Sequence, residues 1–140
     1  MIIKMIPGKL QTSWLSGVKA GLDVWTSYAV SLADFRQTVL VEGVNYAKAH
    51  GGIAWIVDSS QATGAFSQEI QDFIGREVFP GFVKAGIKYF ITINSKVSSV
   101  TRMTVNSYSA KTGPAGLKLV EVGSVEDAEA WLKANAAAAA

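Results

Sequence analysis

The segment Ile53–Asp58 reads Ile-Ala-Trp-Ile-Val-Asp and is apolar at consecutive positions, without the alternation of a half-buried strand. A short run that is apolar on both faces is typical of a central strand in a parallel sheet, which helices cover on both sides. Parallel neighbours also need long crossover connections, which are usually helices. This segment therefore predicts an α/β fold in which helices flank a buried strand.

A helix is predicted immediately before this strand, over about 31–50. Ser31 and Asp34 form a capping box, in which the serine hydroxyl accepts a hydrogen bond from the backbone three residues on. Apolar residues then recur at helical spacing, and Gly51-Gly52 supplies a left-handed stop.

A second helix is predicted after the strand. Ser67 can cap it, and we expect it to be bent or interrupted near Pro80-Gly81, because proline cannot donate a helical hydrogen bond. Gly86 ends it, and the apolar segment Ile87–Asn94 predicts the next strand.

The remaining segments continue the alternation. Ser95–Thr112 is predicted as a helix, although its valine, threonine and serine content also suits a strand. Gly113–Gly116 predicts a turn into a strand at Leu117–Val122, and a second capping box, Ser124–Asp127, opens a last helix. Three N-terminal segments alternate loosely and predict strands: Ile2–Ile6, Lys9–Leu15 and Leu22–Thr26. We expect a mostly parallel sheet with N-terminal strands and about four helices packed on it.

The length of 140 residues suits one domain, predicted over 1–135. The run of alanines over 136–140 cannot pack selectively, so we expect it to lie outside the fold. With no cysteine and one histidine, we expect no disulfide, no metal site and no cofactor. The net charge of +2 is too small to indicate a nucleic-acid partner, and no apolar stretch is long enough for a membrane span. We expect a cytoplasmic protein.

Three groups of short motifs resemble a known family. They are Val24-Trp25 with Ser31–Phe35, then Trp55–Asp58 with Phe66–Ile70, and finally Val78–Pro80, Gly86-Ile87 and Glu126–Leu132. In this order they resemble the SpoIIAA-like STAS family, above all its uncharacterised bacterial branch, and the shape is distantly related to CRAL-TRIO domains. The resemblance implies a regulatory, non-enzymatic role.

Ser67 is the residue that this resemblance brings forward. In the antagonist branch the central strand ends in Asp or Asn, and nine residues later an Asp-Ser pair presents a serine for phosphorylation. Here Asp58 plus nine is Ser67, but Phe66 stands where that branch has an aspartate. Ser67 is therefore a candidate switch, and the alternative is a plain helix cap.

Asp58, Ser59 and Ser60 form a second candidate site. They follow the central strand at its carboxyl end, where open α/β sheets bind ligands. An acid with two hydroxyls can bind a polar ligand, and the same residues also suit an ordinary turn.

Lys96, Ser98 and Arg102 are candidate anion contacts. Hydroxyls and cations that follow a strand and open a helix can form an anion site, and the alternative is a solvated face. His50 is the only imidazole, and its place at the end of a helix indicates a structural role, so we expect no catalytic residue.

Together these observations favour a non-enzymatic regulatory module that docks a partner protein or senses a small ligand at the Asp58–Ser67 edge. The alternative is a CRAL-TRIO-like binding protein for an apolar or amphipathic anion, with its pocket between sheet and helices and head-group contacts from Lys96 and Arg102. An enzyme ranks third. A homo-oligomer is compatible with either of the first two.

Overall fold

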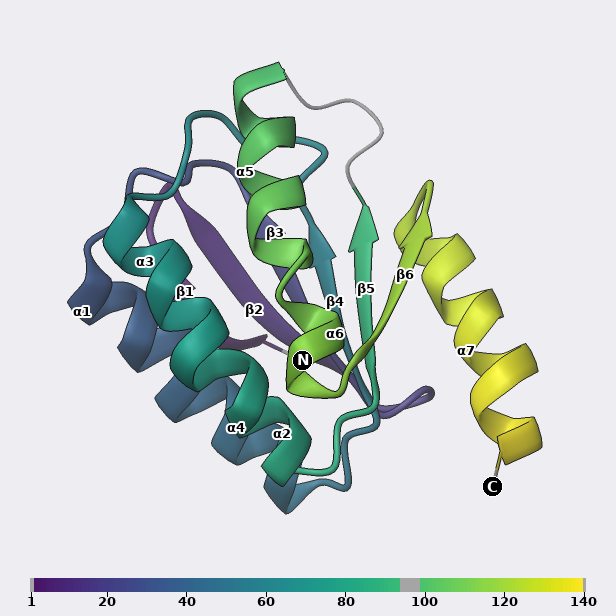
Figure 1. Cartoon of the computed structure of the whole chain (residues 1–140). Coiled ribbons are helices and arrows are strands. Elements are labelled where there is room, and N and C mark those ends of the chain that lie inside the picture. The colour runs from purple at the N-terminus through teal and green to yellow at the C-terminus, as the bar shows by residue number, and fades with distance from the viewer. Residues whose placement is uncertain (1, 94–98, 140) are drawn as a thin grey trace.

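Six strands form one sheet, and they lie side by side in the order in which they occur in the chain (Figure 1). The computed structural model describes residues 2–93 and 99–139. The strands are β1 (Ile2–Ile6), β2 (Leu10–Leu15), β3 (Ala20–Trp25), β4 (Ala54–Asp58), β5 (Tyr89–Ile93) and β6 (Lys118–Val122). The pairs β1–β2 and β2–β3 are antiparallel, and β3 to β6 are parallel. The predicted α/β class with N-terminal strands and a mostly parallel sheet is confirmed.

The pairing of β4 with β5 follows from the helix that connects them. Trp55 lies opposite Phe90 and Ile56 opposite Ile91, so the two strands are parallel neighbours. A strand–helix–strand connection favours adjacent parallel strands.

The helices group into four bodies. The first helix comprises α1 (Leu32–Phe35), η1 (Arg36–Val44) and α2 (Asn45–Ala49); the second comprises α3 (Gln68–Phe73), η2 (Ile74–Val78) and α4 (Phe79–Lys84). The third body comprises α5 (Ser99–Ser109) and the single turn α6 (Thr112–Ala115), and the fourth is α7 (Val125–Ala139). The segments η1 and η2 have π winding, which sequence propensity did not indicate.

Three serines begin helices as predicted. The hydroxyls of Ser31, Ser67 and Ser124 each accept a hydrogen bond from the backbone N–H three residues on, at 3.1, 3.2 and 3.1 Å. Such caps satisfy N–H groups that have no partner within the helix.

Pro80 does not interrupt the second helix, contrary to the expected bend or break near Pro80-Gly81. Helical winding continues through Lys84, and the irregular segment is η2, just before the proline. Pro80 is the second residue of the α-wound segment α4, directly after the π-wound segment η2. Gly86, with φ of +97°, then ends the helix.

The segment after β5 is helical where it is described. The helix predicted over Ser95–Thr112 is present as α5 from Ser99, and residues 94–98 lie outside the described part. The turn predicted at Gly113–Gly116 is one turn of helix, α6, which Gly116 ends with φ of +97°.

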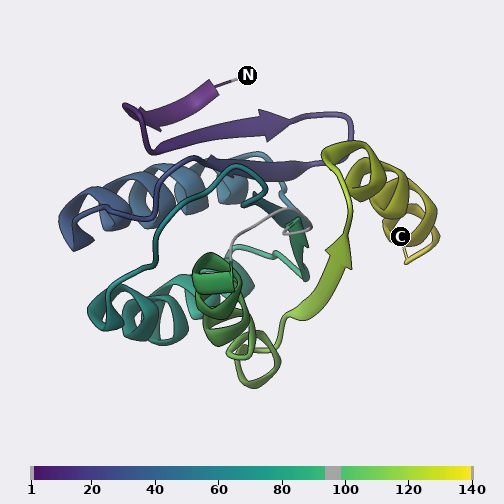
Figure 2. The ribbon, with the colours of Figure 1, turned by 90° about the horizontal axis from the view of Figure 1, so that it is seen from above.

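Helices lie on both faces of the sheet (Figure 2), and each face carries its own apolar core. The first two helices and α5 cover one face, where Trp55, Phe82 and Phe90 pack. Helix α7 covers the other, where Ala128 and Leu132 are buried against the strands. Both faces of β4 are therefore buried, which accounts for its continuous apolar sequence.

Trp55 is fully buried and lies against two glycines. A Cβ on Gly21 would come within 2.1 Å of the indole ring, and one on Gly43 within 2.8 Å. These two positions therefore require glycine for close approach of the ring.

Within the described residues, no helix combines the length and the apolar character needed to cross a membrane.

Candidate functional site

Asp58 ends β4 and organises the turn that follows it. Its Oδ1 accepts hydrogen bonds from the backbone N–H of Ser60 at 3.0 Å and from the Ser60 hydroxyl at 2.6 Å. Ser59 is buried instead: its N–H donates to the carbonyl of Ile93 at 2.8 Å, and its hydroxyl hydrogen-bonds with that of Tyr28. Asp58 and Ser60 can therefore meet a ligand, whereas Ser59 holds the turn to β5 and to Tyr28.

A hollow of about 260 Å³ lies where the carboxyl ends of β4, β5 and β6 meet; we call it the edge hollow. Its lining combines Asp58 and Ser60 with Ser124 and Glu126 from the start of α7. The remaining lining residues are Ile93, Gly123 and Val125. The sequence indicated only a helix start at Ser124, although parallel order alone places all these strand ends at one edge of the sheet.

The described lining of the edge hollow contains two carboxyls and no cation. Glu126 and Asp127 lie in the first turn of α7, where acidic side chains complement the positive end of the helix dipole. The two carboxyls favour a ligand that is rich in hydrogen-bond donors or positively charged.

Ser67 lies outside the edge hollow. It is exposed at the N-terminus of α3, and its hydroxyl accepts a hydrogen bond from the N–H of Ile70. The preceding Phe66 is buried and stacks on Tyr28 with ring centroids 4.1 Å apart. The backbone N–H of Tyr28 donates a hydrogen bond to the carbonyl oxygen of Thr63 at 2.9 Å, which holds the loop in place at Thr63. The structure thus brings Asp58 and Ser60 together with α7 and leaves Ser67 apart, at the end of an anchored loop.

Of the three predicted anion contacts, the structure describes one. Arg102 is exposed on α5, and Lys96 and Ser98 lie outside the described residues.

His50 ends the first helix, as expected. Its Nδ1 lies 2.9 Å from the carbonyl oxygen of Tyr46, and its ring stacks on Tyr46 at 3.9 Å. The described residues contain no cluster of three or more His, Cys, Asp or Glu side chains able to hold a metal ion.

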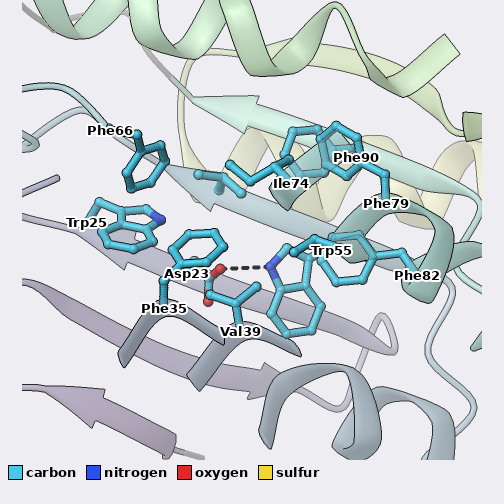
Figure 3. A pocket seen from close by; sticks show the side chains of 12 residues that line it. Asp23, Trp25, Phe35, Val39, Trp55, Phe66, Ile74, Phe79, Phe82 and Phe90 are labelled. Carbon is cyan, nitrogen blue, oxygen red and sulfur yellow. Dashed lines mark hydrogen bonds between the residues drawn. The ribbon is translucent and has the colours of Figure 1, made fainter. Parts of the chain in front are cut away.

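A buried carboxyl, that of Asp23, was missed by sequence reasoning. Oδ1 of Asp23 accepts a hydrogen bond from the Thr12 hydroxyl at 2.7 Å, and Oδ2 accepts one from Nε1 of Trp55 at 2.9 Å (Figure 3). Burial raises the pKa of Asp23 to about 6, against the opposing effect of these two hydrogen bonds. The sequence did contain a signal for it, an acidic residue inside the predicted strand Leu22–Thr26. If its side chain points toward the helices, the carboxyl must be buried.

Asp23 lies at a small cavity between the sheet and the first two helices; we call it the aromatic cavity. It measures about 30 Å³, and seven of its twelve lining residues are aromatic. Besides Asp23, the lining consists of Trp25, Phe35, Val39, Trp55, Val57, Phe66, Ile74, Val78, Phe79, Phe82 and Phe90.

Comparison of the chain with protein-family models, with curated proteins and with solved structures finds no match.

Proposed function

We propose that this chain is a non-enzymatic regulatory module of the STAS-like type that senses a small polar ligand at the edge hollow. The observation that carries the proposal is the convergence of Asp58, Ser60, Ser124 and Glu126 at the carboxyl ends of three parallel strands. Ligands of open α/β sheets bind at this edge. The proposal includes a cytoplasmic location.

A ligand-dependent signal can pass from this hollow to a partner protein through α7. Ser124 and Glu126 lie at the start of α7, whose buried residues Ala128 and Leu132 pack on the sheet. A ligand that binds at the N-terminus of α7 would favour one position of this helix. A partner protein that contacts the exposed face of α7 would then bind according to that position. A second copy of the chain is one form that the partner can take.

The alternative of a CRAL-TRIO-like binding protein for an amphipathic anion receives less support. The cavity between sheet and helices measures only about 30 Å³, and among its described lining residues the carboxyl of Asp23 is the single ionisable group. A carboxylate repels an anion, most strongly where burial lowers the local dielectric constant.

Native mass spectrometry of freshly purified protein tests the proposal. We expect a bound small molecule, lost on denaturation, and at least tenfold lower occupancy in the Asp58→Asn variant. The matched control is Asp34→Asn, which makes the same charge change at an exposed position outside the edge hollow, and it should retain the ligand.

Equal occupancy in wild type and Asp58→Asn would contradict the proposal. A small molecule lost in Asp23→Asn alone would occupy the aromatic cavity instead, because Asp23 lines that cavity and lies outside the edge hollow.

A further inference from the structure

The aromatic cavity combines apolar walls with one buried carboxyl. Strands β3, β4 and β5 form its floor, and the first two helices form its roof (Figure 3). Val39 on η1 and Ile74 and Val78 on η2 line it, so both roof helices have π winding where they border it. Such winding occurs frequently at functional sites.

Asp23 is the only ionisable residue among the described lining residues. It is 2% exposed, and the two donors it accepts from, Thr12 and Trp55, are both neutral. Buried carboxylates in proteins are generally paired with a cation or a metal ion. The carboxyl of Asp23 is therefore buried without a cation beside it among the described residues.

Water is a poor occupant of this cavity. A buried water molecule typically makes about three hydrogen bonds to buried polar groups. Here the described lining offers a water molecule two such side-chain groups, the carboxyl of Asp23 and the indole N–H of Trp25, because the indole N–H of Trp55 already donates to Asp23.

The aromatic walls suit a positive charge. Trp25, Phe35 and Phe66 contact one another, with ring centroids 5.1 to 5.9 Å apart, and all three line the cavity. The face of an aromatic ring attracts a cation within about 6 Å of its centroid, most strongly where water is excluded.

We propose that the aromatic cavity is a binding site for a small organic cation, a primary ammonium group whose charge is paired with Asp23 and whose sides lie against the aromatic rings. The cavity volume of about 30 Å³ fits a group of one or two heavy atoms. A cation beside Asp23 favours the ionised form of its carboxyl and opposes the rise in its pKa that burial causes. The proposal is independent of the edge hollow.

Methylammonium chloride is the probe, and the indole N–H of Trp55 is the reporter, because it donates to Asp23. In two-dimensional nitrogen–proton NMR spectra, methylammonium should shift this signal with saturation, whereas potassium chloride at equal concentration should not. Methanol supplies the neutral control of the same size and should produce no saturable shift.

Asp23→Asn should weaken methylammonium binding at least tenfold, because it removes the charge while retaining the shape of the side chain. Asp34→Asn should leave it unchanged, since Asp34 is exposed and does not line the cavity. An equal shift with methanol, or undiminished binding by a folded Asp23→Asn variant, would overturn the proposal. The comparison of methylammonium with methanol in the wild type decides the matter even if Asp23→Asn does not fold.

Discussion

Burial of the Asp23 carboxyl makes the stability of the fold depend on pH. Its pKa is about 6 in the folded chain and 3.8 without burial, so the folded state holds this proton more tightly. The unfolding free energy should therefore fall as pH rises from about 4 to about 6, by about 3 kcal/mol in total, and should level off above that range.

Urea melts of wild type and Asp23→Asn between pH 4 and pH 8 test this expectation. The variant should lack the Asp23 contribution, so the difference in unfolding free energy between the two proteins should change with pH in that window. A difference that stays constant from pH 4 to pH 8 would show that the pKa of Asp23 is not raised.

The contact of Trp55 with Gly43 predicts an unusual effect of a glycine substitution. Alanine in place of a helical glycine is normally stabilising by up to about 1 kcal/mol. Gly43→Ala should instead destabilise by about 1–3 kcal/mol, because the new Cβ would lie 2.8 Å from the indole ring. Denaturant melts measure the change.

Two further variants isolate the cause. Trp55→Ala should itself cost about 3–5 kcal/mol, and in that background Gly43→Ala should lose its penalty. Gly17→Ala is the control, because an added Cβ there would meet no heavy atom within 4 Å beyond its chain neighbours, and it should not destabilise. A penalty at Gly43 that persists without the Trp55 ring would contradict this explanation.

At the scale of elements, the cap of the second helix is a test of what Ser67 does. Ser67→Ala should lower the unfolding free energy by about 1 kcal/mol, because it leaves the N–H of Ile70 without its acceptor. Ser67→Asp should retain stability, since aspartate caps helices as well as serine does. Urea melts of both variants provide the measurement, and an equal loss in the two would show that the hydroxyl acts otherwise than as a cap.

The helices and strands were predictable because their signals are local. Three helix starts are each predicted within four residues of sequence by a capping serine: Ser31, Ser67 or Ser124. The apolar run that forms β4 predicts a buried strand in the same local way. The π winding of η1 and η2 was not predictable, because it depends on how two helices fit over one sheet. Pro80 is an example. The proline predicts an irregular segment in the second helix, but not that this segment is η2, which ends before the proline.

The two sites depend on strand register, which local patterns do not supply. Thr12 lies opposite Asp23 in the β2–β3 pair, and Trp55 reaches the same carboxyl from β4. At the edge hollow, Asp58 was predictable from the end of its strand, but Ser124 and Glu126 join it only because β6 lies two strands away in the same sheet.

At the scale of the whole molecule, the two cores share the same strands. Trp55 packs on one face of β4 and Ile56 on the other, so neither core can be lost without exposing this strand. We expect one cooperative unfolding transition, in which tryptophan fluorescence and far-ultraviolet circular dichroism coincide.

Leu132→Ala provides the corresponding test from the α7 side. It should lower stability by about 2–5 kcal/mol and shift both signals together, because Leu132 is 1% exposed in the second core. Separate transitions for the two signals would show that α7 detaches before the sheet unfolds.

The spatial order of the strands matches their order along the chain, so no strand has to insert between two that are already paired. A ribosome releases the chain from its N-terminus, and each newly released strand can add to the free edge of the sheet as it emerges. Residues 2–25 can form the β1–β2–β3 meander first, and β4, β5 and β6 then extend it in turn, each arriving with the helix that will cover it. Assembly during synthesis therefore needs no rearrangement of earlier pairings, and α7, which follows β6 in the chain, then covers the second face.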